Sequence, residues 1–135
     1  MRKISKIIVH CTATPAGREV SIAEIDRWHR ARGFRCIGYH YVVMLDGRVC
    51  EGRPVEEIGA HCLGENAESI GVAYVGGLAA DGKTPADTRT PAQKASLRAL
   101  VGALRGRWRE ATVHSHYEFA AKACPCFDAG RELGQ

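Results

Sequence analysis

Apolar residues in this chain occur as short runs of strand type, separated by two longer stretches with helical spacing. The unbroken run at 7–9 is typical of a central strand that is covered on both faces. Four further strands are predicted from β-branched and aromatic runs, at 37–44, 48–51, 69–75 and 111–114. A two-residue Asp46-Gly47 hairpin turn is predicted to join the first two of these.

Two amphipathic helices are predicted between these strands. A capping-box pattern at 21–24 begins a helix over 22–32. The same pattern at 90–93, with a proline at the first helical position, begins a helix whose apolar positions extend to Trp108. Asp128 is a suitable cap for a short final helix.

This order of elements predicts one α/β domain over residues 1–135, with a mixed central sheet flanked by helices. Hydrophobic residues at 45% and charged residues at 25% match an ordinary globular protein. The net charge of +4 is scattered along the chain, so we expect no nucleic-acid partner. The polar N-terminus and the absence of a long apolar run predict a protein that is made in the cytoplasm and has no membrane partner. We expect it to be a monomer.

Side chains that bind soft metals form three local groups: His10 with Cys11, His114 with His116, and Cys124 with Cys126. His10 lies where the first strand ends, and ligand sites in open α/β sheets usually form at that end. Pro125 stiffens the last group, which has no clear helical or strand period. Because a chain made in the cytoplasm is held in a reducing compartment, the six cysteines are better explained as thiols or metal ligands than as disulfides.

The spacing alone leaves several kinds of site open. A closed structural zinc site could use His114, His116, Cys124 and Cys126, although the C-x-C gap is tighter than usual and a domain of this size hardly needs a metal to fold. An open catalytic site would use three protein ligands. A Cys11 nucleophile is disfavoured because adjacent residues of a strand point apart, which keeps His10 from acting as its base.

In their order and spacing, the motifs of the chain resemble those of the type 2 N-acetylmuramoyl-L-alanine amidases, a family of zinc enzymes related to peptidoglycan recognition proteins. The resemblance covers almost the whole chain and is carried by these pieces: Val9-His10-Cys11-Thr12-Ala13-Thr14, Arg27-Trp28-His29, Gly38-Tyr39-His40-Tyr41, Leu45-Asp46-Gly47, Glu51-Gly52-Arg53, Gly59-Ala60-His61, Ser69-Ile70-Gly71-Val72, Val75-Gly76-Gly77, Thr90-Pro91-Ala92-Gln93 and Lys122-Ala123-Cys124-Pro125.

The resemblance implies zinc-dependent hydrolysis of the amide bond between N-acetylmuramic acid and L-alanine in peptidoglycan. It implies zinc ligands at His10, His116 and Cys124, with water in the fourth position. Two neutral imidazoles and one thiolate would leave the metal a net positive charge, which lowers the pKa of bound water.

The phage branch of the family further implies that Tyr39 and Lys122 lie beside the metal as catalytic residues. The Lys122 ammonium would stabilise the developing oxyanion. His61 and Asn66, in a family-like loop, are predicted to bind substrate, and Glu118 could orient a ligand. Cys126 stands where the family has a small polar residue, and it is predicted to be a spare thiol.

The main alternative is a module of the same fold that binds peptidoglycan without cutting it. Recognition proteins of that kind typically lack the cysteine ligand, whereas this chain has Cys124, Lys122 and Tyr39. The sequence therefore favours an endolysin-like enzyme that acts on the cell wall after release or export. A closed zinc domain used for protein contacts is the third possibility.

Overall fold

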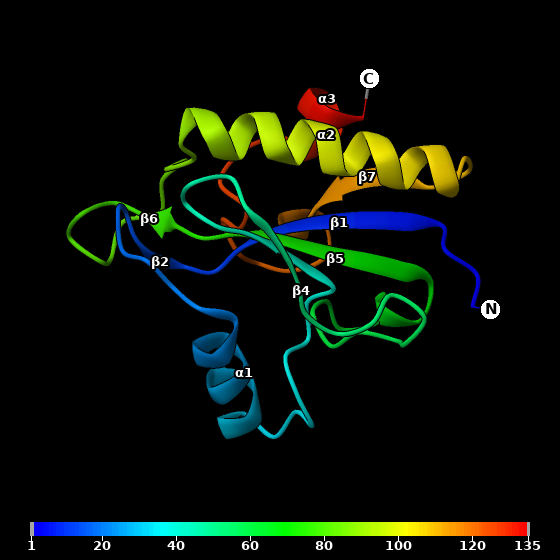
Figure 1. Cartoon of the computed structure of the whole chain (residues 1–135), viewed down its shortest axis with the longest axis horizontal. Helices are drawn as coiled ribbons and strands as arrows, with labels where there is room; N and C mark the ends of the chain where they lie inside the picture. The colour runs from blue at the N-terminus through cyan, green and yellow to red at the C-terminus, as the bar shows by residue number, and fades with distance from the viewer. Residues whose placement is uncertain (1, 135) are drawn as a thin grey trace.

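A mixed five-stranded sheet lies at the centre of the molecule, with the strand order β4-β3-β5-β1-β7 (Figure 1). The computed structural model describes residues 2–134, so only the outermost residue at each end of the predicted domain lies outside it. The strands are β1 (Lys6–Cys11), β3 (Tyr41–Val43), β4 (Val49–Glu51), β5 (Ser69–Tyr74) and β7 (Thr112–Ser115). β1 runs parallel to both of its neighbours, β5 and β7, which confirms its predicted central position.

Helices cover both faces of this sheet (Figure 1). α2 (Pro91–Arg107) and α3 (Ala129–Leu133) pack on one face, where Leu97 and Val101 meet Val9 and Val43 in the larger core. α1 (Ile22–Ala31) covers the other face, where Ile25 packs with Val42. Val42 and Val43 point to opposite faces, as the strand period requires. The mixed α/β fold predicted from the sequence is confirmed.

The predicted helix starts are also confirmed. The Ser21 hydroxyl accepts a hydrogen bond from the Glu24 amide, and Thr90 does the same for Gln93, so both capping boxes form. The buried Gln93 side chain additionally donates to the carbonyls of Val43 and Val75, which ties the start of α2 to the sheet. The Asp128 carboxylate caps α3 by accepting from the Arg131 amide.

Two features differ from the sequence-based expectation. The strand predicted at 37–44 begins only at Tyr41, because the chain at Gly38 packs against a loop: a Cβ on Gly38 would lie 1.9 Å from the Ala60 carbonyl oxygen. A second sheet of two short parallel strands, β2 (Thr14–Pro15) and β6 (Gly77–Leu78), was not predicted. Strands of two residues are too short to show a period.

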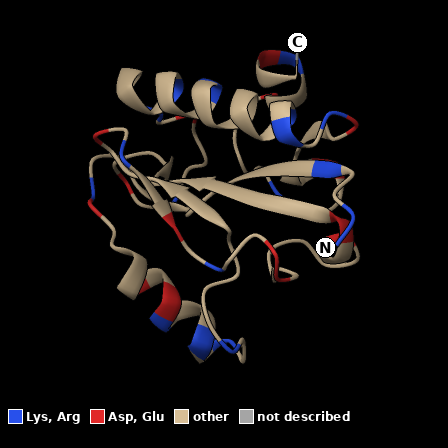
Figure 2. Ribbon diagram, turned by 45° about the vertical axis from the view of Figure 1, so that its right-hand side comes forward, with Lys and Arg blue, Asp and Glu red and all other residues tan. Residues whose placement is uncertain are grey.

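Acidic and basic side chains are interspersed over helices and loops (Figure 2). Several ion pairs are exposed, such as that of Arg48 with Asp46, and pairs of this kind contribute at most about 1 kcal/mol each to stability. Arg89 differs, because its side chain is only 2% exposed and pairs with both Asp87 and Glu132. Among residues 2–134, no helix has the length and apolar character needed to cross a bilayer.

Candidate metal centre

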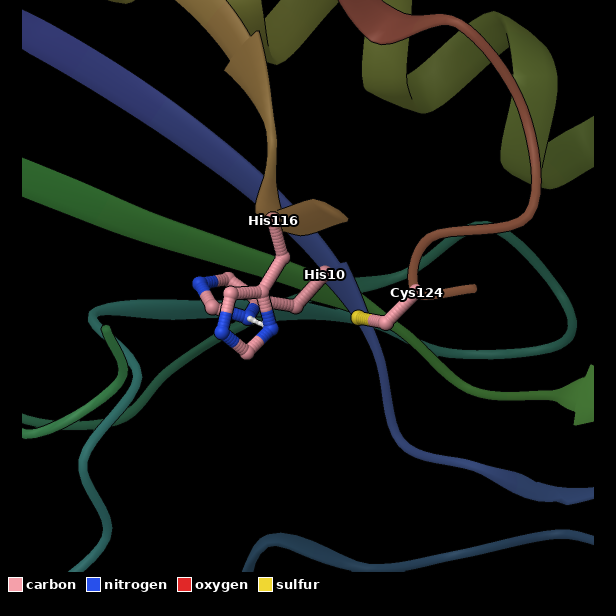
Figure 3. A group of neighbouring side chains, drawn as sticks. All are labelled: His10, His116 and Cys124. Carbon is pink, nitrogen blue, oxygen red and sulfur yellow. Dashed lines mark hydrogen bonds between the residues drawn. The ribbon is translucent and has the colours of Figure 1, made fainter. Parts of the chain in front are cut away.

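Three side chains that could hold a metal ion meet at the carboxyl end of β1 (Figure 3). The ligand atoms of His10, His116 and Cys124 all lie within 4.8 Å of one another. His10 Nδ1 is 3.1 Å from His116 Nδ1, so the two ring nitrogens face each other. The structure thus brings together the three residues predicted to bind zinc; that they bind it stays a prediction.

Neighbouring elements of the sheet bring these ligands together. β7 lies directly beside β1, so the chain leaving β7 passes the end of β1 and places His116 in the short 3-10 helix η2 (His116–Glu118). The loop that follows returns to the same point, where the Tyr117 amide donates to the Cys124 carbonyl at 2.9 Å. The Cys11 amide donates to Cys124 Sγ at 3.1 Å and holds the sulfur beside the strand end.

His10 is supported from behind by a second imidazole. His10 Nε2 lies 2.8 Å from His61 Nδ1, and His61 Nε2 lies 3.1 Å from Ser69 Oγ. A neutral His10 that donates from Nε2 to His61 keeps a free lone pair on Nδ1, directed at His116 and Cys124. This is the tautomer that a metal ligand needs, and hydrogen-bonded partners of this kind commonly orient ligating histidines.

The sequence predicted His61 and Asn66 as substrate-binding residues, and the structure adds a structural role for each. His61 is buried behind His10 and also lines the cavity above the cluster. Asn66 Oδ1 accepts from the amides of His61 and Cys62, both at 2.9 Å, and so shapes the loop that presents His61. Contact of these residues with substrate remains a prediction.

The partnership of His61 with His10 was missed in the sequence, although one signal for it exists. Gly71 lies inside the buried strand β5, and a Cβ there would lie 2.6 Å from the His61 ring. A glycine within a strand indicates close approach by another group, and here that group is His61.

Electrostatics favour the protonation states that a metal requires. Burial holds the pKa of His10 well below its ordinary value, and the neighbouring His61 and His116 lower it further. Burial and the Lys122 ammonium lower the pKa of His116. A hydrogen bond from the Cys11 thiol holds the pKa of Cys124 below that of a free thiol. Zinc binds neutral imidazoles and cysteine thiolates, so these pKa shifts favour the forms of the three side chains that would bind it.

The cluster opens into a cavity of about 630 Å³. Tyr39 and Lys122, the two predicted catalytic residues, both line it. Its described lining residues include the cations Arg32 and Lys122 but neither Asp nor Glu, and its apolar lining includes Trp28, Phe34, Leu63 and Phe119. A cavity with apolar walls and cationic groups suits a substrate that carries negative charge next to apolar groups.

Tyr39 is positioned by ring contacts on two sides. Its ring centroid lies 5.2 Å from that of His10 and 5.1 Å from that of His29. His29 Nδ1 in turn accepts from the Gly38 amide at 2.8 Å, which fixes the segment carrying Tyr39. Burial, together with the nearby Cys124 and Cys11 thiols, raises the pKa of Tyr39. The phenol therefore keeps its proton at neutral pH and can act as a hydrogen-bond donor.

Three further candidates lie outside the cluster. His114 Nδ1 pairs with the Glu118 carboxylate at 2.9 Å, and the other carboxylate oxygen of Glu118 accepts from the Ser115 amide. The Cys126 thiol is directed at the Gly77 carbonyl at 3.4 Å, and burial raises its pKa to about 11. The described residues therefore do not form the closed four-ligand site. All six cysteines are free thiols in this structure.

The buried histidines predict that the metal-free protein loses stability in mild acid. Burial lowers the pKa of His40 and of His61 to about 3 in the folded state. Below the unfolded pKa of about 6.5 the unfolded chain binds protons that the fold does not, so each group can cost about 1.4 kcal/mol per pH unit until pH reaches the folded pKa. We expect a lower urea midpoint at about pH 5 than at about pH 7.5, a window above the titration of carboxylates. Equal midpoints would contradict this linkage.

Comparison with known proteins gives consistent matches over nearly the whole chain. The model of a family described as N-acetylmuramoyl-L-alanine amidase matches residues 1–127. The chain is 43% identical over 125 residues to the endolysin of Escherichia phage T7, covering 93% of this chain and 82% of that protein. The endolysin of Klebsiella phage KP32 is 41% identical over 130 residues, covering 96% and 85% respectively. The solved structure of the Ph2119 endolysin, from a bacteriophage of Thermus scotoductus, superposes with a TM-score of 0.80 at 28% identity, covering 100% of this chain and 88% of that one.

Proposed function

Because the chain belongs to the N-acetylmuramoyl-L-alanine amidase family, we propose that it hydrolyses the amide bond between N-acetylmuramic acid and L-alanine in bacterial peptidoglycan, and that it needs zinc to do so. The observation that supports this proposal most is the cluster of His10, His116 and Cys124 at a cavity that also contains Lys122 and Tyr39.

The donor set suits zinc. Imidazole nitrogen and cysteine sulfur are both ligands that zinc prefers, and three protein ligands leave the fourth position open, as in catalytic zinc sites. His61 would orient His10 from behind, as hydrogen-bonded partners of zinc-bound histidines commonly do. When bound, zinc would supply a Lewis acid that activates water and polarises the amide carbonyl.

Lys122 and Tyr39 would act on the amide directly. The Lys122 ammonium lies at the cavity lining and would stabilise negative charge as it develops on the carbonyl oxygen. The protonated phenol of Tyr39 would donate a hydrogen bond to the same oxygen or orient the attacking water. The cavity itself would hold the sugar and stem peptide, with His61 and Asn66 at one wall.

A second candidate function is peptidoglycan binding without cleavage on the same fold. The sequence feature against it is Cys124, since a module that only binds has no need of a thiolate within ligand distance of two buried imidazoles. The two functions share the substrate, so they differ in whether the amide bond is broken.

The experiment that separates them follows the product. Metal-replete protein incubated with purified peptidoglycan is expected to release stem peptides with a new L-alanine N-terminus, detected by mass spectrometry. A chelator should abolish this release, added zinc should restore it, and chelator saturated with zinc beforehand is the matched control. Binding without release would establish the second function, and release that persists after complete metal removal would refute zinc dependence.

We extend the proposal to the setting in which the protein works. Residues 1–135 would form one amidase domain that acts as a monomer and reaches the cell wall after release or export. The curated relatives that share most of its length are phage endolysins, which supports this setting.

A further inference from the structure

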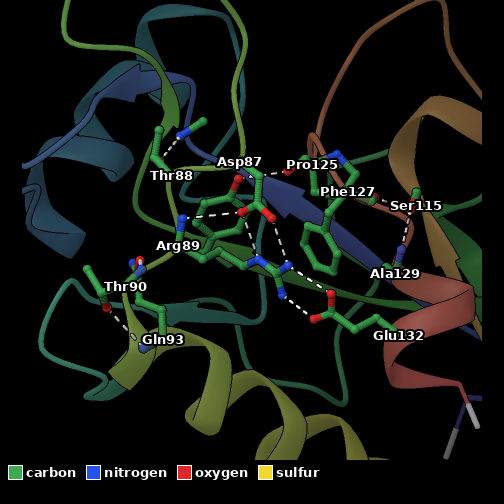
Figure 4. Close-up of polar contacts among 12 residues, drawn as sticks. Asp87, Thr88, Arg89, Thr90, Gln93, Ser115, Pro125, Phe127, Ala129 and Glu132 are labelled. Atoms are coloured by element: carbon green, nitrogen blue, oxygen red, sulfur yellow. Dashed lines mark hydrogen bonds and ion pairs between the residues drawn. The ribbon is translucent and has the colours of Figure 1, made fainter.

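A buried arginine joins three segments of the chain, one of which is the loop that carries Cys124 (Figure 4). The Arg89 guanidinium donates to both carboxylate oxygens of Asp87, at 2.9 and 2.8 Å, and to both oxygens of Glu132 on α3. Its Cζ also lies 3.4 Å from the centroid of the Phe127 ring. We call Arg89, Asp87, Glu132 and Phe127 the arginine clamp. The clamp links the segment before α2, helix α3 and the loop that carries Cys124.

The loop held by the arginine clamp carries the predicted ligand Cys124, and it contacts β7, the strand that leads to the predicted ligand His116. The Phe127 carbonyl accepts from Ser115 Oγ at 3.1 Å, and Ser115 Oγ also accepts from the Ala129 amide at 2.9 Å (Figure 4). Ser115 immediately precedes His116. On the other side of the loop, the buried Tyr74 hydroxyl donates to the Pro125 carbonyl at 2.7 Å. Phe127, three positions after Cys124, is thus bonded to the residue that precedes His116.

The backbone of this loop needs such support. Cys126 adopts a φ of +72°, in the left-handed region that non-glycine residues seldom occupy. A conformation of that kind persists where the surroundings over-determine it. The Cys126 amide donates to the Ala123 carbonyl at 2.7 Å, and the clamp holds the next residue, Phe127.

We propose that Arg89 is a positioning residue for the metal centre: by holding Phe127 against α3, it keeps the Cys124 sulfur at the distance from His10 and His116 that a metal needs. The inference rests on the zinc site of the proposed function. Arg89 touches neither the ligands nor the cavity lining, so it acts through the loop and not on the substrate. Its two carboxylate partners are 31% and 37% exposed, so replacing Arg89 leaves both carboxylates in contact with water.

Cobalt(II) provides a readout other than activity. Bound to a cysteine thiolate in place of zinc, it absorbs through sulfur-to-metal charge transfer, and the loss of that band to excess EDTA measures metal release. Two variants test the clamp. Arg89→Met keeps a long side chain but removes the guanidinium that bonds Asp87 and Glu132. Phe127→Leu keeps these ion pairs but removes the aromatic ring that packs on the guanidinium. Arg48→Met is the matched control, because it removes an arginine from an exposed ion pair on the hairpin. Urea unfolding of each metal-free protein measures its stability. Cobalt release is then measured at a temperature where all variants are folded, so that an effect on the position of Cys124 is separated from a loss of stability.

We expect Arg89→Met and Phe127→Leu to release cobalt about tenfold faster than Arg48→Met. Removing a direct hydrogen-bonded partner of a metal ligand typically changes metal affinity by about 10–100-fold, and Arg89 acts through the loop, so an effect at the lower end of that range is expected. Release equal to that of Arg48→Met from folded variants would overturn the inference. If Arg89→Met does not fold, Glu132→Gln is compared with Phe127→Leu under the same criterion. A wild-type protein without any charge-transfer band would overturn the metal centre itself, so failure of the proposed function is distinguishable from failure of the clamp.

Discussion

The Cys124→Ser variant is expected to lose tightly bound zinc and at least about 10³-fold in kcat/KM, which corresponds to about 4 kcal/mol of transition-state stabilisation. The thiol lies within ligand distance of His10 and His116, and its pKa is already held low by the Cys11 hydrogen bond. A serine hydroxyl neither ionises at neutral pH nor binds soft metals well, so two imidazoles alone would hold the ion. Zinc content by atomic absorption and kcat/KM on a defined muropeptide measure both effects.

The matched control is Cys126→Ser, two residues along the same loop. Its thiol is directed at the Gly77 carbonyl and lies outside the ligand cluster, so this variant should keep its zinc and most of its activity. Full zinc occupancy in Cys124→Ser, or zinc loss in Cys126→Ser, would show that the other thiol is the ligand.

The second large effect is expected at Lys122. Lys122→Met removes the ammonium from the cavity lining while keeping a side chain of similar length. Removing one preorganised group that stabilises an oxyanion typically costs about 10²–10³ in kcat, and we expect a loss of that size with zinc content unchanged. Lys122→Arg, which keeps the charge with a different shape, should recover part of the loss.

Separating kcat from KM tests the assigned role of Lys122. If the ammonium acts mainly on the ground state by attracting an anionic stem peptide, KM rises and kcat stays near the wild-type value. A fall in kcat with a modest change in KM supports stabilisation of the oxyanion. A Lys122→Met variant with wild-type kcat would rule out the catalytic role.

Local signals in the sequence predicted most of the fold. The run at 7–9 and the capping boxes at 21–24 and 90–93 depend on neighbouring residues, and the structure contains each of them. Asp46-Gly47 lies in the predicted hairpin, but the Met44 amide donates to the Arg48 carbonyl, so the loop has three residues, 45–47, and not the predicted two. Two of the residues predicted as ligands, His10 and His116, are 106 positions apart, and they were identified through a family resemblance and not through their spacing. Local periodicity does not report which distant segments meet.

Features that depend on long-range packing were not predicted. His61 supports His10 because a loop folds over Gly71. The glycine within a strand indicates close approach by another group, but no local pattern identifies that group as His61. Arg89 lies in the polar segment before α2, yet its guanidinium is buried because Glu132 and Phe127 pack on it from the end of the chain. A charged residue in a loop is usually exposed, and only tertiary contacts identify the exception.

The parallel pairing of β1 with β7 has a consequence for biosynthesis. β1 is made first, but its neighbour β7 and the cysteine loop follow only after residue 111, so a nascent chain carries His10 without its partner ligands. The metal centre cannot assemble until the final segment has emerged from the ribosome and docked beside β1. On the proposed zinc mechanism, the amidase would stay inert throughout its own translation, and a prematurely terminated product would be unable to attack a cell wall.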